Sequence, residues 1–351
     1  KSSSEKGGGM KVAIIGAGLA GCALAYVFKK SGVKVKVYEA ADKIAGGASG
    51  NDVGLYNPRF FAERNPESDF YAAAFALAIR SFYRFDDVGW NDCGALHLVT
   101  NGQKEGRFPK TVRSWQWEPE HMRMVGAQEA TEIAGVQIKQ DALYLDDSGY
   151  ISPRKLCEFY MRDVDIEYEA DIAKLDDVEA DIVILANGYG AKSFVPWLPL
   201  SRVRGQLSYY TQGANSSELK TVLCYGGYCT PSIGGVHAVG STFQRGEADL
   251  ELRSDDDADN LSKLEAVVPK LASGFEFVKA RAGVRTTVKG HFPIIGKVPA
   301  VENLYVSTGH GSHGILSSLM GAYLLVDMIL ERPLSLSSDT VQALCPSRFE
   351  V

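Results

Sequence analysis

Residues 11–39, KVAIIGAGLAGCALAYVFKKSGVKVKVYE, decide the fold of this chain. The apolar strand KVAII runs directly into the glycine turn GAGLAG at 16–21. Helical composition follows over 19–31, and 33–38 alternates between apolar and polar residues as a strand does. Glu39 closes this second strand. Strand, glycine turn, helix, strand and acid make the complete fingerprint of a dinucleotide-binding βαβ unit, which predicts a Rossmann-like parallel sheet.

Each part of the fingerprint has a physical role. Gly16 permits the tight turn, Gly18 lets the backbone approach a pyrophosphate, and Gly21 lets the helix pack on the strand. The helix N-terminus offers unpaired N–H groups and a partial positive charge to phosphates. Glu39 can accept hydrogen bonds from ribose hydroxyls. We expect the adenosine half of the cofactor to contact these residues together with Leu19, Ala20 and Ala40.

Two further stretches favour FAD over NAD. The small-residue loop AGGASGN at 45–51 lets backbone pass close to a long flat ligand, and we expect Ala48, Ser49, Gly50 and Asn51 to contact the flavin end. The buried-type strand DIVILA at 181–186 is expected to return to the first sheet. Ala186 and Gly188, where it ends, are further predicted cofactor contacts.

The C-terminal part carries a second glycine-rich turn that enters a helix. Arg285 stands on a predicted strand, LYVST at 304–308 is another strand, and GHGSHG at 309–314 precedes an amphipathic helix over 315–330. Such a helix N-terminus can stabilise negative charge, including charge that grows on a reduced flavin. The predicted contacts are Gly311, Ser312, His313, Gly314 and Ile315.

Taken in order, GAGLAG, GGASGN, GVR…FPIIG and GHGSHGIL resemble the D-amino-acid oxidase/glycine oxidase (DAO) family along nearly the whole chain. The resemblance implies an α/β fold with a Rossmann-like FAD domain and an interleaved substrate domain, mainly an antiparallel sheet. No histidine stands directly after the GGASGN loop and no cysteine lies between Arg281 and Tyr305, so we expect the FAD to be non-covalent.

Within the family, the chain is most similar to the FAD-dependent oxidase domain of bacterial bifunctional tRNA-modifying enzymes. The similarity rests on GLYNP at 54–58, RGQLS at 204–208, LCYGGYCTP at 223–231, GSTF at 240–243 and ALCPSRF at 343–349. It implies oxidation of the carboxymethylaminomethyl group on a wobble uridine, with release of glyoxylate. The 351 residues contain no methyltransferase half, so we expect methylation to need another protein.

The same resemblance suggests roles for five residues in catalysis. Arg285 is expected to pair the substrate carboxylate, although a structural ion pair would also explain an arginine there. His310 and His313 are expected near the flavin, where a pKa near 6.5 would let either carry charge; a plain loop role is the alternative. Tyr225 and Tyr228 line the pocket or pack in the core. The family often has an arginine where this chain has Ser312 and His313, which removes a second cation for the carboxylate.

The predicted macromolecular partner is tRNA, bound through local basic clusters, because the net charge of −6 argues against attraction by bulk charge. Solvated surface is the alternative reading. The clusters contain Lys279, Arg281, Lys289, Arg202, Arg204, Arg59 and Arg64.

Composition bounds the remaining expectations. The 351 residues allow about two domains. We assign 10–90, 141–200 and 281–351 to the FAD domain, 91–140 and 201–280 to the substrate domain, and 1–9 to a flexible tail before Met10. Six cysteines without metal-ligand spacing indicate free thiols, no metal site and a cytoplasmic protein, and the apolar run over 12–28 is too short to span a membrane.

Two rival functions share the flavin motifs. One is a small-molecule oxidase of glycine, sarcosine or a D-amino acid, against which only the RGQ, LCYGGY and CPSRF segments speak. The other is a non-catalytic, flavin-stabilised tRNA-binding subunit. Reduction of the flavin by substrate would exclude the second.

Overall fold

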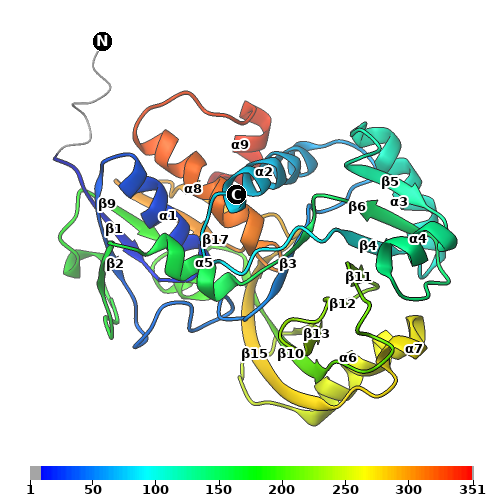
Figure 1. The fold of residues 1–351 in the computed structure, drawn as a ribbon. Helices are drawn as coiled ribbons and strands as arrows, with labels where there is room; N and C mark the ends of the chain where they lie inside the picture. The colour runs from blue at the N-terminus through cyan, green and yellow to red at the C-terminus, as the bar shows by residue number, and fades with distance from the viewer. Residues whose placement is uncertain (1–8, 350–351) are drawn as a thin grey trace.

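The structure is a computed structural model that describes residues 9–349. The tail predicted at 1–9 therefore lies outside the described residues, apart from Gly9. Figure 1 shows two lobes, with the N-terminal strands on the left and the strands labelled β4 to β6 on the right, joined below by the long ribbon of β10 and β15.

The first lobe is built on a six-stranded sheet in the order β16-β17-β9-β1-β2-β8. Its neighbours are parallel except for β16 and β17, which are antiparallel. The predicted return of the DIVILA strand is confirmed, because β9 pairs in parallel with β1 and places Ala13 opposite Val183. The strands are β1 (Lys11–Ile15), β2 (Lys34–Tyr38), β8 (Asp165–Glu167), β9 (Ile182–Leu185), β16 (Ile294–Lys297) and β17 (Leu304–Thr308).

Helices cover this sheet and close its core. α1 has no acid or base before Lys29, and Cys22, Leu24 and Phe28 are fully buried. These side chains share one hydrophobic core with Phe70 and Leu325, so the helices pack on one another as well as on the sheet. The helices of this lobe are α1 (Leu19–Lys30), α2 (Pro66–Phe82), α5 (Pro153–Tyr160), α8 (Gly314–Ile329) and α9 (Ser338–Leu344).

The second lobe carries a larger, mostly antiparallel sheet in the order β14-β10-β13-β12-β11-β4-β6-β5, with β15 paired to β10. Only the β11–β4 pair is parallel. Its strands are β4 (Ala95–Leu98), β5 (Met122–Val125), β6 (Ala142–Leu145), β10 (Leu200–Thr211), β11 (Val222–Cys224), β12 (Tyr228–Cys229), β13 (Val236–Gly240), β14 (Gln244–Arg245) and β15 (Phe277–Val288). Its helices are α3 (Gly102–Trp115), α4 (Ala127–Ala134), α6 (Ser254–Val267) and α7 (Pro269–Ala272).

The remaining elements are a short strand pair and 3-10 turns. β3 (Gly54–Tyr56) and β7 (Gly149–Ile151) form a separate antiparallel pair. Short 3-10 turns lie at η1 (Leu175–Asp177), η2 (Gly188–Ser193) and η3 (Pro346–Phe349).

The predicted domain boundaries need correction at two strands. β6 lies within 141–200, which we assigned to the FAD domain, yet it pairs with β4 and β5 of the second sheet. β15 begins before residue 281 and runs to Val288, with all of its pairing on β10. Antiparallel pairing partners, rather than position in the chain, decide to which sheet these strands belong.

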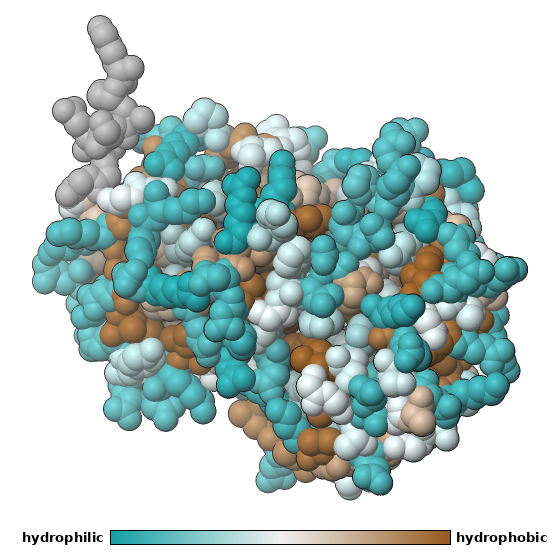
Figure 2. Space-filling view, viewed as in Figure 1, coloured by the Kyte–Doolittle hydropathy of each residue, from teal (hydrophilic) through white to brown (hydrophobic). Residues whose placement is uncertain are grey.

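Hydrophilic side chains cover most of the face shown in Figure 2, with hydrophobic side chains in smaller areas between them. Across residues 9–349, no helix is both long and apolar enough to cross a bilayer. In the same range there is no group of three or more His, Cys, Asp or Glu side chains that could hold a metal ion.

Candidate active site

The glycine turn after β1 has the geometry that its sequence requires. Gly16 has φ +102°, and a methyl group there would lie 2.7 Å from the Cα of Asn187 and 2.8 Å from the carbonyl oxygen of Ala186. A methyl group on Gly21 would collide with the carbonyl of Gly16. The turn is therefore pressed between β9 and the start of α1, and only glycine fits both positions.

Glu39, at the end of β2, faces the same turn. Its carboxylate accepts hydrogen bonds from the backbone N–H of Ala17 at 2.7 Å and of Ala41 at 2.9 Å. Ser49 also contacts this turn, and its Oγ accepts from the N–H of Leu19 at 3.0 Å. The first turn of α1, one acid and one hydroxyl thus line a groove suited to a diphosphate and a ribose.

An arginine from the second sheet supports the loop over 45–51. Arg281, on β15, donates to the carbonyl of Gly47 at 2.6 Å and to Oδ1 of Asn51 at 3.0 Å. Gly50 is needed here because a methyl group would meet the Arg281 guanidinium. Arg281 therefore positions the cofactor loop, which leaves little of its guanidinium for the tRNA contact expected from sequence.

These features border one cavity of about 1050 Å³ that runs between the two lobes. Of the predicted cofactor contacts, Gly21 and Gly50 do not line the cavity, and both instead make room for neighbouring groups. The others do line it: Gly16, Gly18, Leu19, Ala20, Glu39, Ala40, Ala48, Ser49, Asn51, Ala186, Gly188, Gly311, Ser312, His313, Gly314 and Ile315.

The residues present fit FAD. The glycine cradle and the acid sit at one end, and the cavity continues past the 45–51 loop to the turn before α8. Asn187, next to the cradle, has a buried Oδ1 without a hydrogen-bond partner, and such an atom is normally satisfied by a ligand or water.

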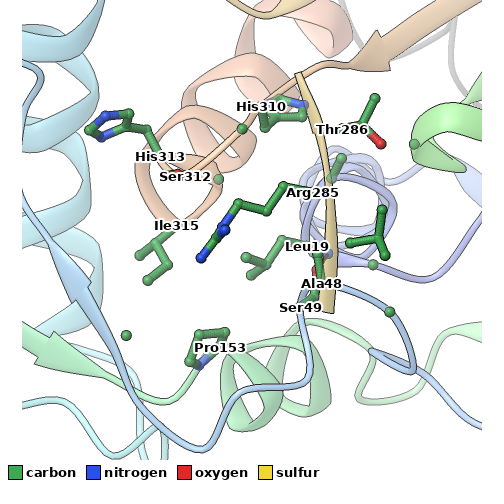
Figure 3. Close-up of a pocket in the computed structure, with 18 of the residues that line it drawn as sticks. Leu19, Ala48, Ser49, Pro153, Arg285, Thr286, His310, Ser312, His313 and Ile315 are labelled. Atoms are coloured by element: carbon green, nitrogen blue, oxygen red, sulfur yellow. Dashed lines mark hydrogen bonds between the residues drawn. The ribbon is translucent and has the colours of Figure 1, made fainter. Parts of the chain in front are cut away.

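Arg285 reaches into the middle of this cavity, between Leu19 and the turn that contains His310 and Ser312 (Figure 3). It donates to Oγ of Ser241 at 2.5 Å and to the carbonyl of Thr242 at 3.3 Å. Within residues 9–349 it forms no ion pair with an acid, and burial lowers its pKa. A partly buried guanidinium with only neutral partners is an incomplete site for an anion.

A glycine on the paired strand gives Arg285 its space. β10 and β15 pair with Gly205 opposite Gly283 and Val203 opposite Arg285. A methyl group on Gly205 would lie 2.7 Å from the Arg285 Cζ. The RGQ segment noted in the sequence thus gives the Arg285 guanidinium room through its glycine, although Gly205 itself does not line the cavity.

The two predicted histidines lie beside the cavity but are neutral, because burial lowers the pKa of His310 and of His313 to about 4. The ring of His310 contacts Oγ of Ser307 at 3.1 Å and Oγ of Ser317 at 2.8 Å. The expectation that either could be charged near neutral pH is therefore corrected. His310 is a fixed neutral ring, and His313 packs beside Tyr71 with centroids 5.2 Å apart.

The two tyrosines differ in position. Tyr228 lines the cavity, and burial raises its pKa, so its hydroxyl remains protonated. Tyr225 is not among the lining residues; it is buried, and its hydroxyl donates to the carbonyl of Tyr228 at 3.3 Å. Core packing, the alternative weighed for both, describes Tyr225.

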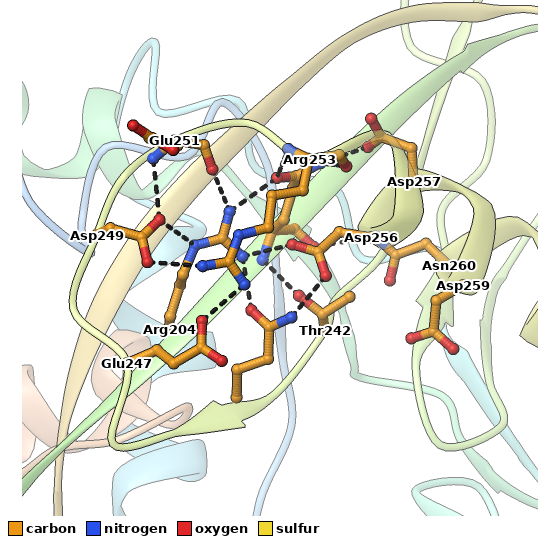
Figure 4. A network of polar contacts seen from close by, with 12 residues as sticks. Arg204, Thr242, Glu247, Asp249, Glu251, Arg253, Asp256, Asp257, Asp259 and Asn260 are labelled. Atoms are coloured by element: carbon orange, nitrogen blue, oxygen red, sulfur yellow. Dashed lines mark hydrogen bonds and ion pairs between the residues drawn. The ribbon is translucent and has the colours of Figure 1, made fainter.

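Arg204 does not belong to a basic surface, contrary to the prediction. It is 0% exposed and pairs with the carboxylate of Asp256, and its Nη1 donates to Oε1 of Gln244 at 2.6 Å. Figure 4 shows this network, in which Asp249 also lies 3.3 Å from the Arg204 Nε. Because β10 alternates its side chains, Arg204 points away from Gly205 and toward α6. Asp256, in the first turn of α6, is 4% exposed.

Most other residues of the predicted basic clusters have protein partners. Lys279 pairs with Asp52 at 2.7 Å, Arg64 pairs with Asp69 at 2.5 Å, and Arg59 pairs with Glu67. The Arg202 guanidinium lies over the ring of Tyr189 at 4.0 Å. Lys289 is exposed. These contacts leave the predicted phosphate-binding role of the clusters without structural support.

Sequence reasoning missed several lining residues. Ser241 and Phe243 contact Arg285, Thr286 follows it on β15, and a separate group of lining residues is formed by Phe60, His97, Lys104, Arg107 and Phe108. The basic pair at 104 and 107 has the spacing of one helix face, which was a usable signal. Nothing local connected that pair with His97 on a different element.

A family profile and curated relatives both match most of this chain. The profile of a family described as FAD dependent oxidoreductase, DAO, matches residues 11–328. The tRNA 5-methylaminomethyl-2-thiouridine biosynthesis bifunctional protein MnmC of Idiomarina loihiensis is 32% identical over 361 residues, which cover 97% of this chain and 59% of that protein. The MnmC protein of Azoarcus sp. is 30% identical, covering 96% and 59%. The chain thus spans about three fifths of the length of these curated relatives.

Solved structures with the same fold have lower sequence identity. Glycine oxidase from Geobacillus kaustophilus superposes with a TM-score of 0.84 at 20% identity, covering 97% of this chain and 99% of that one. Iminodiacetate oxidase from Chelativorans sp. BNC1 gives a TM-score of 0.80 at 20% identity, covering 95% and 98%.

Proposed function

This chain belongs to the DAO family of FAD-dependent oxidoreductases, and from that premise we propose that it oxidises the carboxymethylaminomethyl group of a tRNA wobble uridine. The family, the fold and the FAD cofactor predicted from the sequence are confirmed. The observation that carries the proposed substrate is Arg285, a cavity arginine without an acidic partner, in a chain about 30% identical to MnmC proteins.

The proposed reaction requires that one C–H bond of the substrate be oriented toward the hydride acceptor. A CH₂ group lies between the carboxylate and the secondary amine, and one of its C–H bonds must point at the acceptor. Bound FAD supplies the acceptor for the hydride. Arg285 would grip the carboxylate with two N–H donors, which fixes the position of this CH₂ in the cavity.

The neutral groups beside Arg285 favour the reactive form of the substrate. The amine must lose its proton to donate a hydride equivalent, and a nearby carboxylate would hold that proton in place. Ser241, Tyr228 and His310 are uncharged at neutral pH, with the His310 pKa lowered to about 4 by burial. Loss of hydride from carbon and of a proton from nitrogen gives an imine, and water then releases glyoxylate and an aminomethyl-uridine.

Three further parts of the proposal concern the methylation step, the location of the enzyme and the attachment of the FAD. The name of the relatives implies methylation of the aminomethyl product, which we assign to another domain or protein. A reaction on tRNA would place the enzyme in the cytoplasm. We further propose that the FAD is held without a covalent bond.

Anaerobic bleaching of the oxidised flavin absorbance tests the proposal. The enzyme is mixed with tRNA that carries carboxymethylaminomethyl-uridine, with the same tRNA lacking the modification, and with free glycine, sarcosine and D-alanine. Bleaching by the modified tRNA alone, with glyoxylate released, is expected. Bleaching by a free amino acid at comparable efficiency would contradict the tRNA substrate.

The second candidate is a small-molecule amine oxidase, and the same residue favours it. Arg285 would hold the carboxylate of free glycine or sarcosine with the same two donors. The non-catalytic alternative has no feature that favours it, and any substrate-dependent bleaching would exclude it.

A further inference from the structure

The cavity has a second basic region, separate from Arg285. Lys104 and Arg107 on α3 and His97 on β4 line it, together with the rings of Phe60 and Phe108. Phe60 packs edge-on against His97 with centroids 4.7 Å apart. We refer to these five residues as the α3 subsite.

Two buried nitrogens of the α3 subsite have no hydrogen-bond partner, and its two cations have no carboxylate partner among the described residues. His97 is 8% exposed, and its Nε2 is buried without a hydrogen-bond partner. Nε of Arg107 is buried and unpartnered as well. Lys104 donates to Oγ1 of Thr100 at 2.8 Å and to the carbonyl of Leu98 at 3.4 Å, both neutral acceptors. Over the described residues, neither Lys104 nor Arg107 forms an ion pair with a carboxylate.

The lowered pKa values of the three basic residues also favour an anionic ligand at the α3 subsite. Burial, together with the charges of Lys104 and Arg107, lowers the pKa of His97 to about 3. Burial also lowers the pKa of Lys104 and of Arg107. Partly buried cations that repel one another cost free energy unless an anion is bound between them.

The anion is not one already accounted for. The diphosphate of the cofactor is expected to bind at the first turn of α1. Figure 1 shows α3 and β4 in the opposite lobe from β1 and α1. The substrate carboxylate has Arg285. A free amino acid such as glycine has no second anionic group, whereas a nucleotide carries phosphates next to its base.

We propose that the α3 subsite binds a phosphate of the substrate nucleotide, with Lys104, Arg107 and His97 Nε2 as donors and Phe60 beside the ribose or base. The inference rests on the proposed tRNA function and adds the nucleotide contact that distinguishes tRNA from a free amine. The geometry makes the enzyme read two anions at once, the carboxylate through Arg285 and the phosphate through α3.

The test compares two small substrates that differ only in phosphate. These are carboxymethylaminomethyl-uridine as the nucleoside and as its 3′,5′-bisphosphate, each used to bleach the flavin of the holoenzyme anaerobically. In the native enzyme the bisphosphate should half-saturate at a concentration about tenfold or more below that of the nucleoside. Equal half-saturation would overturn the inference.

Variants test whether the α3 subsite causes the difference in half-saturation between the bisphosphate and the nucleoside. Lys104→Met and Arg107→Met should each raise the half-saturating concentration of the bisphosphate by about tenfold and leave that of the nucleoside unchanged. Lys110→Met is the matched control, since Lys110 is exposed on the same helix and does not line the cavity. Equal losses in Lys110→Met, or equal losses with the nucleoside, would overturn the inference.

A second readout does not depend on turnover. Inorganic phosphate should raise the pKa of His97, followed by the NMR shift of its ring C–H protons, and Arg107→Met should abolish the change. If phosphate moves the His97 pKa but no uridine substrate bleaches the flavin, the proposed function fails while the anion subsite stands. If phosphate leaves the His97 signal unchanged, the subsite itself is refuted.

Discussion

Arg204 and Arg285 stand on two directly paired strands, and they show how differently one sheet can use a buried arginine. Arg204 is enclosed by Asp256, Gln244, Gln206 and a backbone carbonyl. Arg285 faces the other side of the pair and has only a serine hydroxyl and a carbonyl.

The difference follows from register. Val203 is opposite Arg285, so Arg204 points to the other face, where the first turn of α6 brings Asp256 and Asp257. Gln206 and Ser208, on that same face, both donate to Oδ1 of Asp257. Arg204 is buried with carboxylate partners and stabilises the fold, whereas we propose that Arg285, half-buried without such partners, binds an anionic ligand.

Removing the enclosed arginine should have the largest effect on stability. Arg204→Met leaves the carboxylate of Asp256 buried and unpaired, and it should lower the free energy of unfolding by about 3–5 kcal/mol. Denaturant unfolding of the holoenzyme measures it. The double variant Arg204→Met/Asp256→Asn should recover part of the loss. If Arg204→Met were as stable as the native protein but bound substrate poorly, Arg204 would belong to the substrate site and not to the support of the fold.

Removing the open arginine should instead affect turnover. Arg285→Met loses two charge-assisted hydrogen bonds to the carboxylate, each worth about 1.5–3 kcal/mol, so kcat/KM should fall by about 100-fold or more. The unfolding midpoint and the FAD content should remain at native values. Anaerobic stopped-flow bleaching and denaturant unfolding on the same preparation give both numbers. Unchanged kcat/KM would remove Arg285 from the site.

His310 sharpens the comparison, because it faces the cavity yet has complete partners in Ser307 and Ser317. Its pKa is about 4 in the folded protein and 6.5 as the ordinary value, so the unfolded chain takes up a proton first as pH falls. Its contribution to stability is therefore full above pH 6.5 and declines toward pH 4. His310→Gln should reduce that slope by up to about 1.4 kcal/mol per pH unit. Unfolding measured across this pH range checks the slope, and an identical slope in the variant would contradict it.

The smallest expected effect comes from the glycine that makes room for Arg285. In Gly205→Ala the added methyl group displaces the flexible guanidinium. The KM of the carboxylate substrate should rise by about tenfold while the fold is retained. Gly102→Ala is the control, because a methyl group there meets nothing within 4 Å. Equal KM values in both variants would show that Arg285 can shift without consequence.

The sequence predicted the cofactor end of the molecule far better than the substrate end. Residues 11–39 form one local unit in which turn, helix and acid are neighbours along the chain, so the strands and their parallel pairing could be read directly. Whether Arg204 or Arg285 faces the cavity depends on the pairing of β10 with β15 and on where α6 packs. These are long-range contacts that no local pattern reports.

The same reason explains the missed α3 subsite. His97 and Lys104 come from a strand and a helix whose mutual placement depends on the second sheet. Burial is equally non-local. Burial keeps His310 and His313 neutral by lowering their pKa values. It also surrounds the ion pair between Arg204 and Asp256, two residues far apart in the sequence.

The most direct test of the account is binding of methoxyacetate, a carboxylate in which oxygen replaces the oxidisable amine. Titration into the oxidised holoenzyme is followed by the perturbation of the flavin spectrum, for the native protein, Arg285→Met and Arg204→Met. Tight binding in the native protein and in the folded fraction of Arg204→Met, with loss in Arg285→Met, is the predicted result. Equal binding by native protein and Arg285→Met would contradict the claim that this arginine awaits the substrate carboxylate.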